Sequence, residues 1–334
     1  MDTNRRMMIA SLPSGSLSAD DFVLDEVAVT EPGDGEVVVE TLALTIGAGQ
    51  RAGLQGSASY AGAPQAGRVM DGTGVGRVVA SRADGVAEGE LVRGQLGWQS
   101  HPTMAADQLE AVPADTDPAH ALGPLGTNGL AAYFGLHELG RPEEGQTLVV
   151  SAAAGSVGHL VGQMAKIHGA RVVGVAGSDD KCRMVVDDLG FDEAVNYRAD
   201  DFRDRFKAAT PDRIDVYFDN TGGDILGSAL FRMALHGRIV CCGAVSQYDT
   251  STPDPSPRGI PGLLVNNRVR MEGYVVFDYA DRYAEGRAQM SAWIGSGEVR
   301  PLATEFDGLT SAGQAFVELL NGSTVGTTIV RVAS

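Results

Sequence analysis

The sequence predicts an α/β protein in which an irregular β domain carries, as an insertion, a second domain built on a doubly wound parallel sheet. Three observations lead to this fold class. Short strand-like runs separated by turn clusters fill the first 125 residues. From residue 125 to about residue 277, strand-like and helix-like segments alternate. The chain then closes with a strand that is hard to place in a parallel sheet and easy to return to the first domain.

Runs of apolar and β-branched residues between turn-forming residues define the outer elements. In the first domain we expect strands at residues 22–29, 36–46, 74–80 and 90–94, with turns at 31–35 and 84–85. A linking helix at 130–139 leads into the second domain, and the tail is predicted to form helix 283–296, strand 302–306, helix 311–320 and strand 327–332. We therefore assign residues 1–125 and 300–334 to one domain and 126–299 to the other.

The most informative stretch is TLVVSAAAGSVG, residues 147–158. Residues 147–150 are of the type found in a buried parallel strand, and an amphipathic helical segment follows the small residues. Gly155 and Gly158 let backbone amides approach a pyrophosphate at the positive start of that helix. Ala153 stands where the G-x-G-x-x-G pattern has its first glycine, so the motif alone is a weak indication of a dinucleotide site.

The strands that follow strengthen this prediction. They are expected at residues 171–176, 214–218 and 238–242, and they end in GSDDK, DNTGG and Gly243. Parallel strands that end in small or polar residues are typical of a sheet whose carboxyl edge binds a ligand. Glycines that only let strand and helix pack closely would not explain so many strand ends of this kind. We therefore predict a dinucleotide-binding domain.

Composition excludes several classes of function. The 334 residues carry a net charge of −17, which argues against non-specific binding to nucleic acid or to anionic membranes. No segment is apolar for long enough to span a membrane, and the apolar stretch after Arg6 stops at Pro13, too short for a signal-peptide core. We expect a cytoplasmic protein that acts on a small molecule. The three cysteines indicate no disulfide framework.

Taken together, these residues resemble the zinc-free branch of the medium-chain dehydrogenase/reductases, which contains leukotriene B4 dehydrogenase/prostaglandin reductases, plant alkenal double-bond reductases and bacterial curcumin-reductase-like proteins. The resemblance covers nearly the whole chain. It is carried by residues 38–44, Arg51, 74–76, 97–99, 125–126, 129–136, 152–158, 177–181, 196–197, 219–223, 242–244, 270–279 and 326–330. It implies a GroES-like irregular β-barrel domain that binds substrate and a Rossmann domain that binds NADP.

Three departures from the family pattern fall where the substrate pocket is expected. Residues 47–51 read GAGQR in place of the usual Asp-Pro that precedes Met-Arg, and residues 127–128 read TN in place of Met-Pro. Asn266 replaces a tyrosine that contacts cofactor and substrate in mammalian and plant members. The substrate-pocket residues predicted from these segments are Gln50, Arg51, Thr127, Asn128 and Asn266. The resemblance therefore says more about the cofactor than about the substrate.

The end of the second strand indicates which cofactor is bound. NAD-specific folds place a carboxylate there, whereas NADP needs a position free of negative charge and supplied with a cation. Here Gly177 and Ser178 are neutral and Lys181 follows one helical turn later. Asp179 or Asp180 could be the NAD carboxylate, but as first-turn residues they also favour the helix dipole. Lys181 could equally be a solvated helix residue.

The resemblance decides between these readings, because it implies that Lys181 and Tyr197 hold the 2′-phosphate of NADPH. Asn220 and residues 243–248 are expected to line the ribose and nicotinamide side. Asn220 could instead be only a turn residue, and residues 274–276 could be an apolar strand at a dimer edge. The residues predicted to bind the cofactor are Ala154, Gly155, Ser156, Val157, Gly158, Ser178, Lys181, Tyr197, Asn220, Cys242, Gly243, Ala244, Tyr248, Tyr274, Val275, Val276 and Thr324.

A zinc-dependent alcohol dehydrogenase needs cysteine or histidine ligands in the first domain, and structural zinc needs four cysteines. Residues 1–125 contain no cysteine, and their histidines are His101 and His120. We therefore predict a zinc-independent enzyme. Without a Lewis acid to generate an alkoxide, hydride delivery to an already electron-poor carbon is favoured.

The predicted reaction is reduction of a carbon–carbon double bond conjugated to a carbonyl. Hydride passes from NADPH to the β-carbon, charge moves to the carbonyl oxygen, and the α-carbon is protonated. Tyr60 and Tyr248 are the candidate proton donors, although each could serve packing or cofactor contact instead, and water could supply the proton. The alternatives are an NADPH quinone reductase and a cofactor-binding tailoring protein of natural-product metabolism. A homodimer is also expected, because residues 274–277 would lie at or near a sheet edge.

Overall fold

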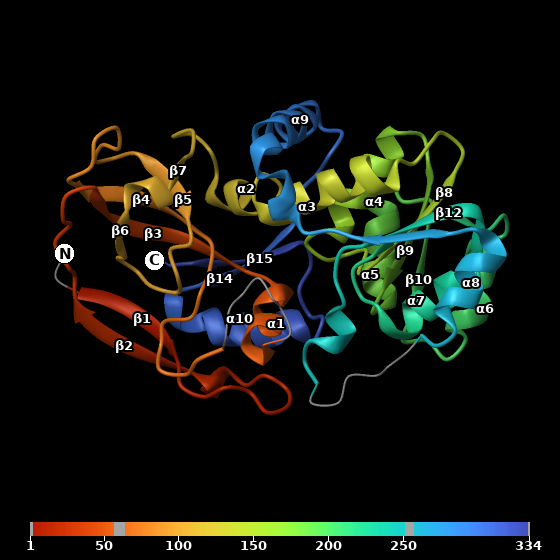
Figure 1. The fold of residues 1–334 in the computed structure, drawn as a ribbon, viewed down its shortest axis with the longest axis horizontal. Coiled ribbons are helices and arrows are strands. Elements are labelled where there is room, and N and C mark those ends of the chain that lie inside the picture. Colours follow the sequence, from red (N-terminus) through yellow and green to blue (C-terminus); the bar gives the residue numbers. More distant parts are fainter. Residues whose placement is uncertain (1–2, 57–63, 251–256, 333–334) are drawn as a thin grey trace. The chain divides into compact units, whose positions relative to one another are not determined.

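The structure, a computed structural model, describes residues 3–56, 64–250 and 257–332, so the predicted proton donor Tyr60 lies outside the described residues. The chain divides into two units (Figure 1). The first unit comprises Met1–Gly123, Asp249–Ser251 and Ala303–Ser334, and the second comprises Pro124–Tyr248 and Thr252–Leu302.

The first unit is built on β-sheets. Its larger sheet has seven strands in the order β14-β15-β3-β4-β5-β7, with β6 paired to β3. These are β3 (Glu36–Ile46), β4 (Gly74–Ser81), β5 (Leu91–Gly94), β6 (Thr103–Ala105), β7 (Glu110–Ala111), β14 (Ala303–Asp307) and β15 (Thr327–Arg331). The closing strand β15 pairs antiparallel with β3, so it returns to the sheet of the N-terminal strands as the sequence predicts.

β1 (Thr3–Ile9) and β2 (Phe22–Ala28) form a separate antiparallel pair. The sequence does not predict β1, because Arg5 and Arg6 interrupt its apolar residues. In the structure Arg6 forms an ion pair with Asp25 of β2, and Arg5 lies 3.6 Å from Glu26. The cross-strand partner therefore supplies a stabilisation that the local pattern does not reveal.

Helices and aromatic side chains close the core of the first unit. The helices are α1 (Ala48–Gln55), α2 (Pro118–Leu122) and α10 (Ala312–Leu320), with 3₁₀ turns η1 (Ala19–Asp21), η3 (Ala106–Gln108) and η7 (Leu309–Ser311). Trp98 is fully buried, with its ring centroid 4.9 Å from that of Phe22 and 6.0 Å from that of Phe316 of α10. Aromatic burial of this kind dominates core energetics.

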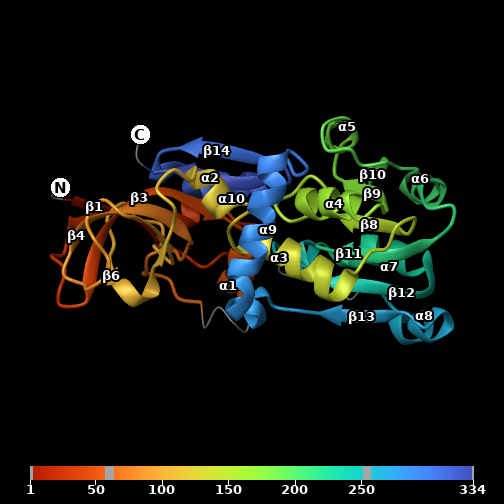
Figure 2. The same cartoon turned by 90° about the horizontal axis from the view of Figure 1, so that it is seen from above.

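The second unit holds a six-stranded parallel sheet in the order β10-β9-β8-β11-β12-β13, which can be followed in Figure 2. The strands are β8 (Thr147–Ser151), β9 (Arg171–Ala176), β10 (Glu193–Asn196), β11 (Ile214–Asp219), β12 (Met233–Cys241) and β13 (Arg270–Gly273). The chain starts at β8, runs outward through β9 and β10, and then returns to β11 on the other side. A topological switch point therefore lies between β8 and β11, where open α/β sheets bind ligands. This arrangement confirms the predicted fold class.

Helices cover both faces of this sheet. The helices of the second unit are α3 (Thr127–Phe134), α4 (Gly158–Ile167), α5 (Asp179–Asp187), α6 (Phe202–Ala209), α7 (Gly223–Leu230), α8 (Ile260–Asn267) and α9 (Tyr283–Ser296). α3 continues into a π-helical turn η4 (Gly135–Gly140), α9 packs against α3, and η5 (Val245–Gln247) and η6 (Val276–Arg282) are 3₁₀ segments. Helices α6, α7 and α8 share one apolar cluster with Val149, Val173 and Tyr217 of the sheet. Helix α4 packs on the opposite face, where a Cβ on Gly162 would lie 1.9 Å from the ring of Phe191.

Residues 274–276, for which an apolar strand was one alternative, lie outside the sheet and directly after its last strand. β13 ends at Gly273, and η6 begins at Val276. The hydroxyl of Tyr274 donates to the carbonyl oxygen of Ala131 at 2.6 Å, which ties the segment to α3 and turns it away from the sheet. In the part of the chain that the structure describes, no helix has the length and apolar character needed to cross a membrane.

Candidate dinucleotide site

The glycine turn lies at the carboxyl end of β8, directly before α4. Ala152 has a positive φ of 49°, and the amide of Gly155 donates to its carbonyl oxygen at 2.8 Å. A Cβ added to Gly158 would lie 2.2 Å from that same oxygen, and one added to Gly155 would lie 3.1 Å from it. Among the described residues no side chain caps α4, and the positive end of this helix faces the turn. The amides of His159 and Leu160 in its first turn donate to the carbonyl oxygens of Gly155 and Val157, each at 3.1 Å. The turn therefore fits a pyrophosphate.

A cationic site lies at the end of β9, where the ribose phosphate of NADP would be expected. Ser178 caps α5 by accepting the amide of Lys181 at 3.3 Å, and a Cβ on Gly177 would lie 3.2 Å from the ring of Tyr197. Burial and the nearby Arg198 both lower the pKa of Lys181. The guanidinium carbon of Arg198 lies 5.6 Å from the Tyr197 ring centroid. Two cations held close together on a strongly acidic chain suit a phosphate.

The two carboxylates that could have marked an NAD site are engaged elsewhere. Asp179 accepts a hydrogen bond from the side-chain amide of Asn196 at 3.1 Å. Asp180 forms an ion pair with Arg183 on the same exposed helix face. The strand end itself, Gly177 and Ser178, stays neutral. This arrangement favours a 2′-phosphate over a 2′-hydroxyl partner.

Asn220 follows β11 and is 7% exposed. Its backbone amide donates to the Ser151 hydroxyl at 2.9 Å, and its side-chain amide donates to the Ser151 carbonyl oxygen at 2.7 Å. The side chain thus joins the ends of β8 and β11. Gly222 and Gly223 continue the turn with positive φ values of 67° and 60°.

The turn after β12 holds the third group of predicted residues. A Cβ on Gly243 would lie 3.3 Å from the carbonyl oxygen of Asn220, so the turns after β11 and β12 are in contact. The amide of Ala244 donates to the hydroxyl oxygen of Tyr248 at 3.1 Å. Burial raises the pKa of the Cys242 thiol to about 11, so this thiol stays protonated. Its sulfur lies 3.2 Å from the hydroxyl oxygen of Tyr274.

The remaining predicted cofactor residues belong to both units. Val275 is 38% exposed, and Val276 is buried. Thr324 is buried in the first unit, just before β15. The structure therefore brings together the residues at the ends of β8, β11 and β12 and, separately, those at the end of β9.

The five predicted substrate residues fall in both units. Thr127 and Asn128 occupy the first turn of α3 and are half-buried, and Asn266 lies exposed near the end of α8. Gln50 accepts the amide of Gly47 at 2.7 Å and donates to a carbonyl oxygen at 2.6 Å, as part of the start of α1.

Arg51 is buried in the first unit, where it forms an ion pair. Its side chain is 1% exposed, and its Nε donates to Asp249 at 2.8 Å. Its Nη2 donates to the carbonyl oxygen of Gly15, and Asp249 also accepts the amide of Leu17 at 2.8 Å. The guanidinium is thus enclosed by protein groups. The sequence does not predict this ion pair.

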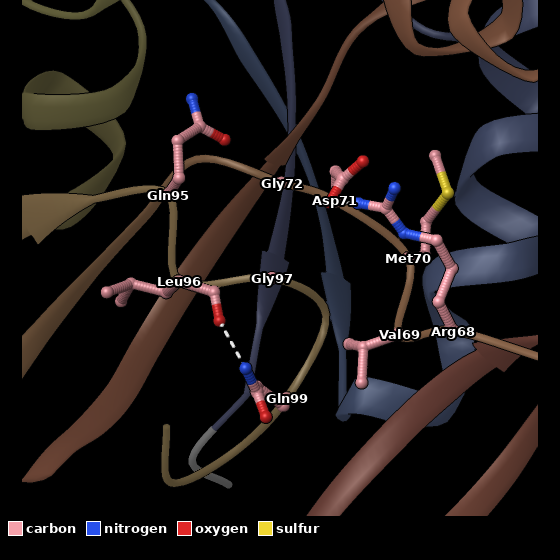
Figure 3. Close-up of a pocket in the computed structure, with 9 residues that line it drawn as sticks. All are labelled: Arg68, Val69, Met70, Asp71, Gly72, Gln95, Leu96, Gly97 and Gln99. Atoms are coloured by element: carbon pink, nitrogen blue, oxygen red, sulfur yellow. Dashed lines mark hydrogen bonds and ion pairs between the residues drawn. The ribbon is translucent and has the colours of Figure 1, made fainter. Parts of the chain in front are cut away.

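A hollow of about 250 Å³ opens on the first unit, between residues 68–72 and residues 95–99 (Figure 3). In Figure 3 the side-chain amide of Gln99 turns back to the carbonyl oxygen of Leu96, at 2.8 Å. Arg68 is paired with Asp71 on its rim. None of the predicted site residues is among the residues that line it. Within residues 3–56, 64–250 and 257–332, no three His, Cys, Asp or Glu side chains gather to hold a metal ion.

His159 of α4 is fully buried behind the glycine turn. Its Nδ1 lies 2.8 Å from the carbonyl oxygen of Gly155, and its Nε2 accepts the amide of Leu302 at 3.0 Å. The ring is therefore neutral, with the proton on Nδ1. Burial lowers the pKa of His159 from 6.5 to about 4.

This shift predicts acid sensitivity. Because the unfolded chain binds the proton more tightly, the free energy of unfolding should fall as the pH drops from about 6.5 to about 4, by about 3 kcal/mol from this group. Urea unfolding measured across this pH range checks it. His159→Gln should remove that part of the slope, because the amide cannot titrate. An equal slope in the variant would contradict the assignment, since His137 and His168 would then account for it.

Comparisons with known proteins agree with this geometry. The family described as the N-terminal domain of oxidoreductase matches residues 5–112, and the family described as zinc-binding dehydrogenase matches residues 156–292. The chain is 37% identical to the NADPH-dependent curcumin reductase of Escherichia coli, over 99% of this chain and 97% of that protein. It is 34% identical to the NADP-dependent 2-alkenal reductase of Nicotiana tabacum, over 99% of this chain and 98% of that protein.

A solved structure is also similar. The structure of CurA from Vibrio vulnificus in complex with NADPH superposes with a TM-score of 0.94 at 34% identity, and the match covers 99% of both chains.

Proposed function

Since this chain belongs to the zinc-free branch of the medium-chain dehydrogenase/reductases, we propose that it uses NADPH to reduce the carbon–carbon double bond of α,β-unsaturated ketones and aldehydes. The observation that carries the proposal is the pairing of an uncapped glycine turn after β8 with a cationic site after β9, on one edge of one sheet. That pairing suits a dinucleotide with a 2′-phosphate.

We assign the binding of the cofactor to residues at the ends of four strands, β8, β9, β11 and β12. The glycine turn and the positive end of α4 bind the pyrophosphate. Lys181 and Tyr197, with Ser178 between strand and helix, bind the ribose phosphate. Asn220 and residues 242–244 bind the nicotinamide side, and the predicted contacts of Val275, Val276 and Thr324 belong to the same proposal. When bound, NADPH supplies the hydride that reaches the β-carbon of the substrate.

A proton must then reach the α-carbon, and the carbonyl oxygen needs a hydrogen-bond donor. Tyr248 suits either task, because its hydroxyl oxygen accepts the Ala244 amide, and among the described residues its own proton has no acceptor. Tyr60 stays a second candidate, and water a third. Thr127, Asn128 and Asn266 supply polar side chains on the substrate side, where they would select substrates more polar than an all-apolar pocket accepts.

Lys181→Ala tests the cofactor assignment. We expect the KM for NADPH to rise about tenfold or more, because a cation on the phosphate is lost, and the KM for NADH to change by less than about twofold. Steady-state kinetics with both cofactors measures this. Lys166→Ala is the matched control, because Lys166 lies on α4 and pairs at 2.8 Å with Asp192, which directly precedes β10 at the amino end of that strand. Equal losses with NADPH and NADH would contradict a 2′-phosphate contact.

An acceptor panel tests the reaction class. Purified protein with NADPH should oxidise the cofactor in the presence of enones and enals, and more slowly or not at all with quinones or saturated ketones. A preference for quinones would favour the quinone-reductase alternative. Tight NADPH binding without oxidation by any acceptor would favour a cofactor-binding tailoring protein and contradict the reductase.

The proposal also includes a homodimer and a cytoplasmic location. β13 is the last strand of its sheet, and Val275 and Phe277 just after it are 38% and 52% exposed, which suits pairing with a second copy. Light scattering at micromolar concentration would give twice the chain mass if this is right. The three cysteines are free thiols, as is usual in a reducing compartment.

A further inference from the structure

Asp219, the last residue of β11, is a buried carboxylate that the proposed function leaves without a role. Its side chain is 2% exposed. One carboxylate oxygen, Oδ1, accepts hydrogen bonds from the Ser151 hydroxyl at 3.2 Å and the Tyr217 hydroxyl at 3.0 Å. The same oxygen accepts the backbone amides of Thr221 at 3.0 Å and Gly222 at 2.9 Å.

The backbone of the same residue reaches a third strand end. The carbonyl oxygen of Asp219 accepts the amides of Cys242 at 2.8 Å and Gly243 at 3.2 Å. Ser151 directly precedes the glycine turn, and its hydroxyl also accepts the amide of Asn220. One residue is therefore bonded to the ends of β8, β11 and β12, which are neighbours in the sheet and include the two strands that flank its switch point.

Burying a charged carboxylate lowers the stability of the fold, so a carboxylate at this position is expected to have a role beyond packing. The partners of Asp219 among the described residues are hydroxyls and amides, and none is a cation. Burial raises the pKa of its carboxyl group, which expresses the cost of the charge. A neutral side chain would fill the site at lower cost to stability. A carboxylate, however, can align several donors on one oxygen and so fix several turns at once.

We propose that Asp219 is a positioning residue that sets the relative placement of the turns after β8, β11 and β12, and through them the binding of the nicotinamide half of NADPH. This inference rests on the proposed function. It assigns no cofactor contact to Asp219 itself. The adenosine end of the cofactor, held at the end of β9 by Lys181 and Tyr197, is independent of this junction.

The test compares two ligands on one variant. Isothermal titration calorimetry of Asp219→Asn should give a Kd for NADPH about tenfold or more above the wild type. The Kd for adenosine 2′,5′-bisphosphate, which carries only the adenosine end, should change by less than about threefold. Asp215→Asn is the matched control, because Asp215 lies at the other end of β11 and also accepts a β8 amide, that of Thr147 at 2.8 Å. It should leave both affinities within about twofold of the wild type.

A Kd for NADPH unchanged in Asp219→Asn would overturn the inference. Equal losses for NADPH and the bisphosphate, with a lower melting temperature, would also overturn it, because they would indicate a role in the whole fold. If Asp219→Asn does not fold, Ser151→Ala removes one hydroxyl from the same junction. It should weaken NADPH about threefold and spare the bisphosphate, and equal affinities for wild type and Ser151→Ala would count against the junction. A wild-type chain that binds neither ligand would overturn the proposed function itself.

Discussion

Gly158→Ala is expected to weaken NADPH binding by about a hundredfold or more and to lower stability by about 3 kcal/mol. The added Cβ would lie 2.2 Å from the carbonyl oxygen of Ala152 and 3.0 Å from the Cα of Ala153, and both neighbours are backbone atoms. Ala152 already has a positive φ of 49°, so its peptide cannot shift without further strain. Fluorescence titration with NADPH and urea unfolding measure the two effects.

Gly295→Ala is the matched control. It adds the same methyl group inside α9, where a Cβ would meet no atom of the described residues within 4 Å. We expect unchanged NADPH affinity and a gain in stability of about 0.5 to 1 kcal/mol, because alanine favours a helix over glycine. NADPH affinity within about threefold of the wild type in Gly158→Ala would mean that the cofactor does not depend on this turn.

Arg51→Ala is expected to destabilise the protein by about 3 kcal/mol. The substitution removes a guanidinium that is 1% exposed and leaves Asp249, whose side chain is 22% exposed, without its cation. It also leaves a cavity in the first unit. Urea unfolding monitored by circular dichroism measures the loss. Arg51→Lys should recover only part of it, because an ammonium cannot donate to Asp249 and Gly15 in the same fork geometry.

An exposed ion pair provides the comparison. Arg205 and Asp201 of α6 form a pair at 2.8 Å with side chains 54% and 53% exposed. Arg205→Ala should cost less than about 0.5 kcal/mol, because solvent screens such pairs. A loss in Arg51→Ala no larger than in Arg205→Ala would show that Arg51 does not stabilise the first unit.

The sequence predicts most of what is local in this fold. The β-branched run before residue 152 and the small residues at the ends of three strands place the sheet, its carboxyl edge and the glycine turn. The strand β1 is not predicted, and β13 ends at residue 273, before the apolar segment 274–276 that could have formed a strand. In β1 two arginines mask the pattern, and their partners lie on β2. In the segment after β13, the bond from Tyr274 to Ala131 joins residues 143 positions apart.

In the candidate site, too, the local features are predicted and the contacts between distant residues are not. Lys181, Tyr197 and the glycine turn are predicted because each lies at a strand end with a characteristic spacing. Asp219 was part of a predicted turn, but its bond to Ser151 joins residues 68 positions apart and depends on two strands being neighbours. The pair of Arg51 and Asp249 joins residues 198 positions apart. Such contacts follow from strand order and chain return, which periodicity does not specify.

The reaction itself can be tested by the position of a label. An unbranched α,β-unsaturated ketone incubated with the protein and NADPH carrying deuterium at C4 of the nicotinamide should give the saturated ketone. The two C4 stereoisomers are used in separate reactions, and one of them should place deuterium on the β-carbon, as seen by NMR. The proton added to the α-carbon should come from water. An allylic alcohol with deuterium on the carbonyl carbon would contradict conjugate reduction.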